Sequence, residues 1–582
     1  TAAEKEQQRL AGADILKRIY AAAKNNEGRI NIPQGIYRFS ELQQPAQPTH
    51  ILLKNVKDFT IEGNGSWFYF EHQASAFKLS NCDNVTIRNI NIDSDPLPYA
   101  QGTVISLNDN PPRSFVFKPD AGYEMPEMLL RDNVGWSQET QGNRRILLFD
   151  KETKLIKADQ LSMDIPGGSE PVRKLADGNY EVKTWVWWGR SLEEAGFEIG
   201  MPVALWRRAG RAIRLEVCGK IVLDNVDVYA SGYVAYVGYF GDGPFIFLNC
   251  DLKLRPNTSR LMSCNADGFN VRGTLKGAVI ENCSTEAIGD DCVNLQGVYY
   301  KVFKQVGPTE LIVAPTFEND GANPVWHFID GAPWNDPDRP EDKNLKTWEY
   351  LGKRKVLSKT PMKYTIPADR KMHEWAAAAR YEPGKEYPAL QVKLDTPVTV
   401  DANAIFWSEN SVVGGSVIRN NVFTNNLARG IRLQTIDAIV ENNKISYSTN
   451  AALTLGGQPG FWGESTNCRN IVIRNNVFAD SGRCAGNAAV VMKVEGVAEK
   501  AEPIGNILFE NNRIINPRGS GIELSGCDDI TIVNNTISGL KSRPYKEEYN
   551  PSVFVDKKEY GKPIIMGGGL KNVKIENNQV TP

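Results

Sequence analysis

One short phrase recurs along the chain and strongly limits what the chain can fold into. Each copy alternates apolar and polar residues, which is typical of a β-strand, and then continues with Asn and another apolar residue. The copies are 24 residues apart from Asn225 to Asn249 and 22 apart from Asn420 to Asn442. The phrase occurs as VTIRNINI (85–92), IVLDNVDV (221–228), FIFLNCDL (245–252), AVIENCST (278–285), SVIRNNVF (416–423), AIVENNKI (438–445), IVIRNNVF (471–478), ILFENNRI (507–514), ITIVNNTI (530–537) and VKIENNQV (573–580).

A fixed period of 22 to 24 residues predicts an all-β solenoid, a right-handed parallel β-helix in which each phrase is part of one coil. Asn suits the bends because it tolerates the left-handed backbone conformation and because stacked Asn amides can hydrogen-bond between coils. The alternative is a β-sandwich with Asn-rich turns. A sandwich gives no reason for one phrase to repeat at a fixed period, so the solenoid is favoured.

The rest of the sequence divides around the repeats. Residues 1–93 predict an amphipathic N-terminal capping helix and the first coils. Two stretches interrupt the period and alternate like strands, so we expect two inserted β-rich, barrel-like domains at 94–211 and 298–408. Catalytic coils are expected between them at 212–297, and C-terminal coils at 409–582.

Three carboxylates fall in register when the coils are aligned by their second strand. The strands of NADGFNV (265–271) and DDCVNLQ (290–296) place Phe269 and Val293 inward, and Asn270 and Asn294 outward. Asp267 then aligns with Asp291, and Asp290 follows Asp267 by 23 residues, which is one coil. We therefore expect these acids to meet at one corner, on a partly exposed surface, with Arg429 of the next aligned coil beside them.

Clustered acids have a catalytic and a structural interpretation. Asp267 and Asp290 could simply form turns, as ADG and GDD sequences often do. Stacked in register, however, like charges raise a carboxyl pKa, so that one group gives a proton to a glycosidic oxygen while another activates water. Calcium is a competing occupant of such a cluster because it prefers hard oxygen ligands.

Composition narrows the function classes. The chain has 67 basic and 69 acidic residues and a net charge of −2, which gives no electrostatic case for a nucleic-acid or membrane-surface partner. It contains no apolar run that approaches the ~20 residues of a membrane span. The nine cysteines form no zinc-like pairs, so we expect buried thiols and no metal or other cofactor.

The acid motifs resemble those of polygalacturonases, which are β-helix glycosidases. The match consists of NADG (265–268) followed one coil later by GDDC (289–292). The resemblance implies that Asp290 is the proton donor and that Asp267 and Asp291 position the attacking water. The Gly-His-Gly and Arg-Ile-Lys motifs of those enzymes are missing, and ARGIRLQ (428–434) is the nearest substitute, which argues against a galacturonate substrate.

Over most of its length the chain also resembles glycoside hydrolase family 110, the exo-acting α-1,3-galactosidases. The match rests on SDPLPYAQGTV (94–104), the spacing of the aspartates, the paired insertions and GFWGES (460–465). This resemblance implies a β-helix with inserted barrels, removal of terminal galactose with inversion, and no metal. Acids only ~5 Å apart usually indicate retention, but a water held beside two bases is compatible with inversion.

A neutral sugar needs hydrogen-bonding groups and a flat apolar surface. The outward face offers Asn270, Asn294, Arg429, Arg432 and Gln434, each of which could instead be an ordinary solvated strand position. Trp407 and Trp462 are candidates for stacking under the ring, and Glu464 is a candidate polar partner.

The leading hypothesis is a glycosidase acting on glycans with terminal α-galactose. The alternatives are another β-helix glycosidase acting on α-glucan or pectin-like chains, and a non-catalytic calcium- or carbohydrate-binding solenoid. The chain begins at Thr1 rather than Met, which fits either a removed leader or a trimmed chain, and we expect a secreted or periplasmic protein. Inserted barrels often bury surface against a partner, so a homodimer is also expected.

Overall fold

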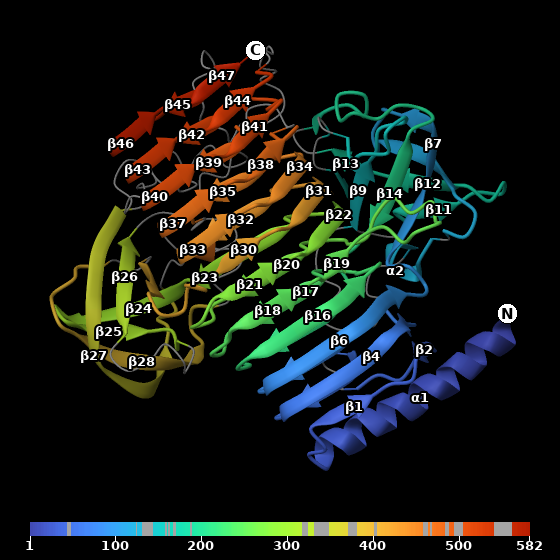
Figure 1. The fold of residues 1–582 in the computed structure, drawn as a ribbon, viewed down its shortest axis with the longest axis horizontal. Coiled ribbons are helices and arrows are strands. Elements are labelled where there is room, and N and C mark those ends of the chain that lie inside the picture. Colours follow the sequence, from blue (N-terminus) through green and yellow to red (C-terminus); the bar gives the residue numbers. More distant parts are fainter. Residues whose placement is uncertain are drawn as a thin grey trace.

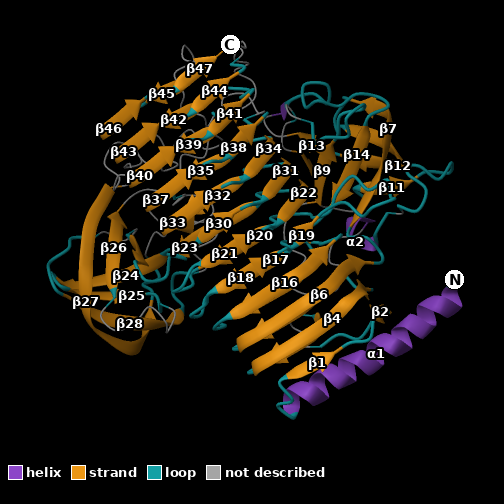
Figure 2. Ribbon diagram, viewed as in Figure 1, coloured by secondary structure: helices purple, strands orange, loops and turns teal. Residues whose placement is uncertain are grey.

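A computed structural model shows that the chain winds into a long parallel β-helix with a helix at its first end and two β-rich insertions on opposite sides (Figures 1 and 2). The expected all-β solenoid is confirmed. The structure describes all residues except 44–47, 124, 131–143, 158–159, 161–162, 167–169, 187–188, 317–323, 331–348, 370–380, 401–403, 458–463, 466–467, 483–487, 494–503, 541–560 and 582.

Each coil contributes strands to three parallel faces, which we call the first, second and third face in chain order. The first and second faces together form a 21-stranded sheet, and three long strands run through both. The first face contains β1 (Arg29–Asn31), β4 (Lys57–Phe70), β6 (Asp83–Ser94), β16 (Ile221–Val228), β18 (Phe245–Leu248), β21 (Ala278–Glu281), β30 (Val417–Arg419), β33 (Ile436–Glu441), β37 (Arg469–Arg474), β40 (Ile504–Glu510), β43 (Cys527–Val533) and β46 (Lys571–Glu576).

The second and third faces complete the coil. The second face contains β2 (Ile36–Phe39), the later parts of β4, β6 and β16, and β19 (Asp251–Leu252), β22 (Ser284–Ile288), β31 (Val422–Asn426), β34 (Lys444–Ser448), β38 (Val477–Ala479), β41 (Arg513–Ile515), β44 (Thr536–Ser538) and β47 (Gln579–Thr581). The third face contains β3 (Thr49–Lys54), β5 (Ser75–Ser80), β15 (Ile213–Glu216), β17 (Tyr236–Tyr239), β20 (Phe269–Arg272), β23 (Val293–Val298), β32 (Ile431–Gln434), β35 (Leu453–Leu455), β39 (Val490–Met492), β42 (Ile522–Leu524) and β45 (Ile564–Met566), with β36 (Glu464–Ser465) antiparallel to β23.

Where a phrase contains two consecutive Asn residues, the two have different roles. The first, such as Asn420 (φ 59°) or Asn442 (φ 58°), turns the chain between the first and second faces in the left-handed conformation. The second lies inside the coil: the Asn421 side chain donates to Asn443 Oδ1 at 2.9 Å, and Asn443 donates to the Asn476 oxygen at 3.0 Å. Both predicted uses of Asn are therefore present. The buried amide ladder continues through Asn512, Asn535 and Asn578.

Earlier coils fill the same interior with thiols and aliphatic side chains. Cys250 and Cys283 occupy the position of the ladder, and both are buried. All eight cysteines in the described part of the chain are free and buried, as expected, whereas Cys484 lies outside it.

The predicted capping helix is α1 (Ala2–Lys24), which Thr1 caps together with Glu4. Its Ile15, Leu16 and Ile19 are buried in the same core as the coils. The contact with β2 is close, because a Cβ on Gly12 would lie 2.0 Å from the Arg38 carbonyl oxygen. The helix thus covers the first end of the solenoid.

The first insertion is an eight-stranded antiparallel sheet with its own hydrophobic core. In the described residues its strands follow an open order from β11 to β13. Its elements are β7 (Tyr99–Asn108), β8 (Ser114–Pro119), α2 (Glu127–Leu130), β9 (Arg144–Leu148), β10 (Met163–Ile165), β11 (Val172–Lys174), β12 (Tyr180–Lys183), β13 (Trp185–Val186) and β14 (Pro202–Trp206).

The second insertion is a closed barrel with a separate core around Trp326, Phe328 and Phe406. Its strands are β24 (Tyr300–Gly307), β25 (Glu310–Val313), β26 (Val325–Asp330), β27 (Glu349–Thr365), β28 (Glu386–Leu394) and β29 (Ile405–Ser408). The exact domain boundaries stay predictions.

The two insertions leave the coil at opposite ends of the third face. The first departs after β6 and returns at β15, between the second and third faces. The second departs after β23 and returns at β30, between the third and first faces. Figure 1 shows them on opposite sides of the β-helix.

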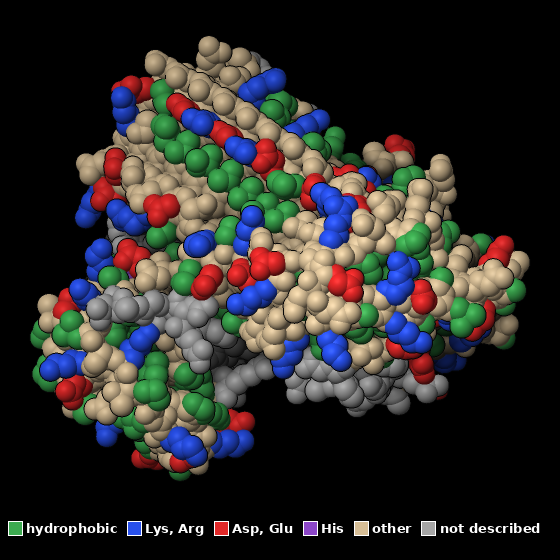
Figure 3. Space-filling model, turned by 60° about the horizontal axis from the view of Figure 1, so that its bottom comes forward, with side chains coloured by type: hydrophobic (Ala, Val, Ile, Leu, Met, Phe, Trp, Pro, Cys, Tyr) green, Lys and Arg blue, Asp and Glu red, His purple; other side chains and the backbone are tan. Residues whose placement is uncertain are grey.

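The outer surface carries mixed charge. Cross-strand ion pairs such as Glu281–Arg419 and Glu441–Arg474, both 2.8 Å, join neighbouring coils. Acidic and basic side chains are interspersed on the face in Figure 3, as the small net charge predicts. Among the described residues, no helix has the length and apolar character that crossing a membrane requires.

Candidate active site

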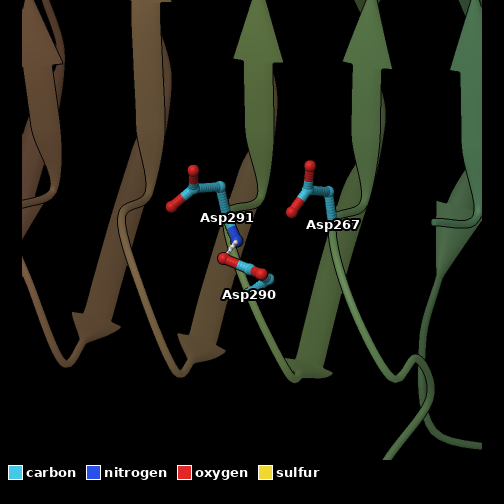
Figure 4. Close-up of side chains that lie close together, drawn as sticks. All are labelled: Asp267, Asp290 and Asp291. Atoms are coloured by element: carbon cyan, nitrogen blue, oxygen red, sulfur yellow. Dashed lines mark hydrogen bonds between the residues drawn. The ribbon is translucent and has the colours of Figure 1, made fainter. Parts of the chain in front are cut away.

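Three aspartates converge where the chain passes from the second face to the third (Figure 4). Asp267 lies just before β20, and Asp290 and Asp291 lie between β22 and β23. Because β20 and β23 pair in register from Phe269 with Val293, Asp267 and Asp291 stand side by side on neighbouring coils. One carboxylate oxygen from each of the three residues lies within 4.8 Å of the others. The predicted convergence is present.

Each carboxylate has a different set of partners. Asp267 Oδ2 accepts a hydrogen bond from Asn270 Nδ2 at 2.6 Å. Asp291 Oδ1 accepts one from the Arg429 backbone N–H at 2.7 Å, and the Arg429 guanidinium lies 3.9 Å from the same oxygen. Asp290 Oδ1 accepts from the Asp291 backbone N–H at 3.2 Å. The expected arginine on the next coil is therefore Arg429.

The expected partial exposure of all three acids is wrong for two of them. Asp267 is 7% exposed and Asp291 is 3% exposed, whereas the Asp290 side chain is 28% exposed. The first insertion emerges on this edge, and its Pro98 and Arg207 carbonyls accept hydrogen bonds from Asn265, two residues before Asp267, a contact that strand alternation alone does not reveal. Asp290 is thus the one acid that presents a substantial surface to solvent.

Burial and mutual repulsion raise the proton affinity of the cluster. Desolvation, followed by the charges of Asp290 and Asp291, holds the pKa of Asp267 well above its usual range. Desolvation also raises the pKa of Asp291, to about 7, although Arg429 works against the rise. A protonated carboxyl and an ionised one can therefore coexist here near neutral pH.

The sequence reasoning missed Arg208, which follows β14 of the first insertion. Its Nη2 atom lies 3.2 Å from Asp290 Oδ2, and its guanidinium stacks on the Tyr233 ring at 5.0 Å. The available signal was the basic run WRRAGRAIR (206–214) where the insertion rejoins the β-helix. Nothing in strand periodicity shows where that run lies in space.

Three of the residues predicted to bind substrate form a row across neighbouring coils. Asn270, Asn294 and Arg432 align across β20, β23 and β32 on the outer side of the third face. All three are buried rather than solvated. Among the described residues, the side-chain oxygens of Asn270 and Asn294 have no hydrogen-bond partner. These two acceptors lie on the strands that follow Asp267 and Asp291.

Arg432 and Gln434 both contact Glu464. The Arg432 Nε lies 3.2 Å from Glu464 Oε2, and Gln434 Nε2 donates to the same oxygen at 2.8 Å. Burial would raise the pKa of Glu464, but Arg432 and Gln434 together bring it below its usual range. Arg432, Gln434 and Glu464 therefore form one buried polar group, and the predicted contact of these residues with a sugar stays a prediction.

Of the two tryptophans predicted to stack on sugar, Trp407 is the one that the structure describes. Trp407 lies in β29 of the barrel, is 2% exposed and stacks on His327 at 4.7 Å. Its ring offers no open face to a sugar, which corrects that prediction. Trp462 lies outside the described residues.

The acid cluster has the donor chemistry of a cation site. Oxygens within 4.8 Å of one another suit a hard ion such as calcium, which takes six to eight oxygen ligands. Arg208 and Arg429, however, already bring positive charge to Asp290 and Asp291. The arrangement therefore favours a cluster that binds protons.

Comparison with known proteins gives a consistent assignment. A family model described as "Right handed beta helix region" matches residues 403–581. The alpha-1,3-galactosidase B of Bacteroides thetaiotaomicron is 23% identical over 84% of this chain and 80% of its own length. The alpha-1,3-galactosidase B of Phocaeicola vulgatus is 25% identical over 92% of this chain and 90% of its own length.

The solved structures that are similar to this chain include the A-module of mannuronan C-5 epimerase AlgE6 from Azotobacter vinelandii. It is 12% identical, covers 97% of this chain and 93% of its own, and has a TM-score of 0.40. The predicted resemblance to α-1,3-galactosidases is confirmed by the sequence relatives, which extend over most of the chain.

Proposed function

We propose that this glycoside hydrolase removes a terminal α-1,3-linked galactose from glycans with inversion of configuration. The observation that carries the proposal is the corner of Asp267, Asp290 and Asp291, where three carboxylates share a space within 4.8 Å but differ in burial. Relatives named alpha-1,3-galactosidase B supply the substrate class.

Asp290 is the general acid in this proposal. A proton donor must reach the glycosidic oxygen of a bound glycan, and Asp290 is the most exposed of the three carboxylates. The three acids together bind a proton more tightly than an isolated carboxyl does, because desolvation and the charges of Asp290 and Asp291 raise the pKa of Asp267 well above its usual range. The cluster therefore has a proton available beside the exposed position.

Asp267 and Asp291 position and activate the attacking water. They stand side by side at the start of β20 and β23 (Figure 4), so that a water between them would meet both. A pKa of about 7 suits Asp291 to accept a proton near neutral pH. In inverting glycosidases the two carboxyl groups usually lie ~6.5 to 9.5 Å apart, which leaves room for the attacking water. In this proposal the water lies beside two bases instead, so the wider separation is not needed.

Asn270 and Asn294 bind sugar hydroxyls in this proposal. A buried acceptor without a partner costs about 1–3 kcal/mol, and a hydroxyl donor would recover part of that cost. Their side-chain oxygens are such acceptors among the described residues. The Arg429 guanidinium, beside Asp291, is a further candidate contact.

The test is release of galactose from an α-1,3-linked galactobiose, followed by proton NMR from the start of the reaction. The wild type should release β-galactose first. Asp290→Asn should slow this substrate about a thousandfold, because the leaving group loses its acid. The same variant should lose far less on dinitrophenyl α-galactoside, whose leaving group needs no proton.

Asp437→Asn is the matched control, because Asp437 is an exposed residue of β33, in the left-handed conformation and on another coil. Its turnover should equal that of the wild type. Initial α-galactose would show retention and a nucleophilic aspartate. Absence of galactose from both linear and branched α-galactosides would refute the substrate class and favour α-glucan or pectin-like chains.

Location and assembly stay part of the proposal. A secreted or periplasmic protein should appear in the corresponding fraction of the producing cell. A homodimer should show twice the mass of the 64.7 kDa chain in light scattering.

A further inference from the structure

We infer that Arg208, which the first insertion carries, is a positioning residue for Asp290 and sets how many protons the three aspartates hold. The inference rests on the proposed function, because it concerns the same acids. It assigns to the first insertion a direct part in the chemistry of a site that the β-helix otherwise builds.

The backbone around Arg208 is fixed to the β-helix on both sides. Asn265, which is fully buried, donates from Nδ2 to the Arg207 carbonyl at 3.0 Å and to the Pro98 carbonyl at 2.9 Å. The Ala209 N–H donates to the Gly232 carbonyl at 2.8 Å. Both ends of the first insertion are thereby anchored to the coils that carry the acids.

The side chain of Arg208 has a defined direction. Its guanidinium stacks on Tyr233 at 5.0 Å, and its Nη2 atom reaches Asp290 Oδ2 at 3.2 Å. Because Asp290 Oδ1 accepts from the Asp291 N–H, the two Asp290 oxygens are held from different directions. This pair of contacts fixes the carboxylate plane of an acid that lies in a turn.

Charged and titratable side chains from several segments face the three aspartates. Arg208 faces both Asp290 and Asp267, and Arg429 and Arg432 act on Asp291, with Arg432 also paired to Glu464. The neutral groups that titrate nearby are the Tyr233 hydroxyl and the thiols of Cys264 and Cys292.

Charge balance then predicts the role of Arg208. With Arg208 and Arg429 in contact with the acids, three ionised carboxylates leave one excess negative charge, which a single bound proton neutralises. Without Arg208 the excess is two, and the cluster should retain a second proton to higher pH. A neutral replacement should therefore move the whole activity profile toward alkaline pH.

The test compares Arg208→Met with Arg208→Lys, using kcat/KM for α-1,3-galactobiose across the pH range. The Met variant should shift both limbs of the profile upward by about one pH unit. The Lys variant keeps the positive charge, so both limbs should return toward their wild-type positions. Its kcat should stay reduced, because Lys lacks the planar guanidinium group that orients Asp290. Arg211→Met is the control, since Arg211 stacks on the same Tyr233 ring at 4.4 Å.

A second measurement does not depend on turnover. The raised carboxyl pKa values of the folded cluster stabilise the fold at low pH, and this stability is lost as pH rises through them. Arg208 opposes the rise of the Asp267 pKa, so Arg208→Met should raise that pKa further, and its loss of melting temperature should be larger at about pH 8 than at about pH 5.

The two outcomes separate the claims. If the wild type has no galactosidase activity but Arg208→Met still loses more melting temperature at about pH 8 than at about pH 5, the proposed function is refuted and the role of Arg208 is supported. An Arg208→Met variant with an unmoved activity profile, and with the same loss of melting temperature at both pH values, would show that Arg208 is only structural.

Discussion

The two insertions leave the same face of the β-helix but have different relations to the site. The first departs at the edge where Asp267, Asp290 and Asp291 gather, and the second departs at the opposite edge. The first is an open eight-stranded sheet in the described residues, whereas the second closes on itself as a barrel.

The contacts of the two insertions differ accordingly. The first reaches the coils through Arg208 to Asp290, through Tyr99 Oη to the Met262 carbonyl at 2.7 Å, and through the Ile156 N–H to Asn425 Oδ1 at 2.7 Å. The barrel buries Trp326 and Phe328 in a core of its own. The comparison teaches that the edge from which an insertion emerges decides whether it becomes part of the site.

Core truncations test this difference most strongly. Phe117 of the first insertion and Phe328 of the barrel are both fully buried, so each Phe→Ala change should cost about 3–5 kcal/mol of unfolding free energy. Phe117→Ala should also lower kcat/KM, because the sheet that carries Arg208 loosens. Phe328→Ala should leave kcat/KM unchanged.

Calorimetry and turnover of the same preparations measure both effects. Equal losses of activity in the two variants would remove the proposed distinction between the insertions. If Phe117→Ala kept full activity, the coils alone would hold the site together.

A smaller effect should follow from the anchor between the site and the first insertion. Asn265→Ala removes the donor to the Pro98 and Arg207 carbonyls and should cost about 1–3 kcal/mol of unfolding free energy. It should also reduce kcat, since Arg208 follows directly after Arg207.

Gln305→Ala is the matched control in the barrel. Gln305 donates to the Val398 carbonyl at 2.7 Å and accepts from the Val400 N–H at 3.0 Å. Gln305→Ala should lower the unfolding free energy about as much as Asn265→Ala does, but should leave kcat unchanged. Chemical denaturation and initial rates measure the two effects. A normal kcat for Asn265→Ala would argue against a functional anchor.

The coil architecture was predictable because it is a local and repeated property. Alternation fixes which residues face inward, so Phe269 and Val293 are buried as expected, and the 23-residue spacing places Asp290 next to Asp267. The separate jobs of Asn420 and Asn421 were less visible, because one sequence position turns the chain and the next lies inside it.

The surroundings of the site were not predictable in the same way. Periodicity shows that Arg432 and Gln434 point outward, but only the fold shows that Glu464, about thirty residues later, pairs with both. Arg208 was missed for the same reason, since its contact with Asp290 spans 82 residues. Such contacts depend on how insertions fold back, which strand patterns do not encode.

The smallest effect concerns the arginine that a coil supplies rather than an insertion. Asp291, with a pKa of about 7, must be ionised to accept a proton from water, so kcat/KM should fall about tenfold per pH unit below that value. The Arg429 guanidinium, 3.9 Å from Asp291, opposes the rise of that pKa. Arg429→Met should therefore move the acid limb upward by less than about one pH unit, because the Arg429 backbone N–H still donates to Asp291. A larger shift for Arg429→Met would make the coil, rather than the first insertion, the main electrostatic control of the acids.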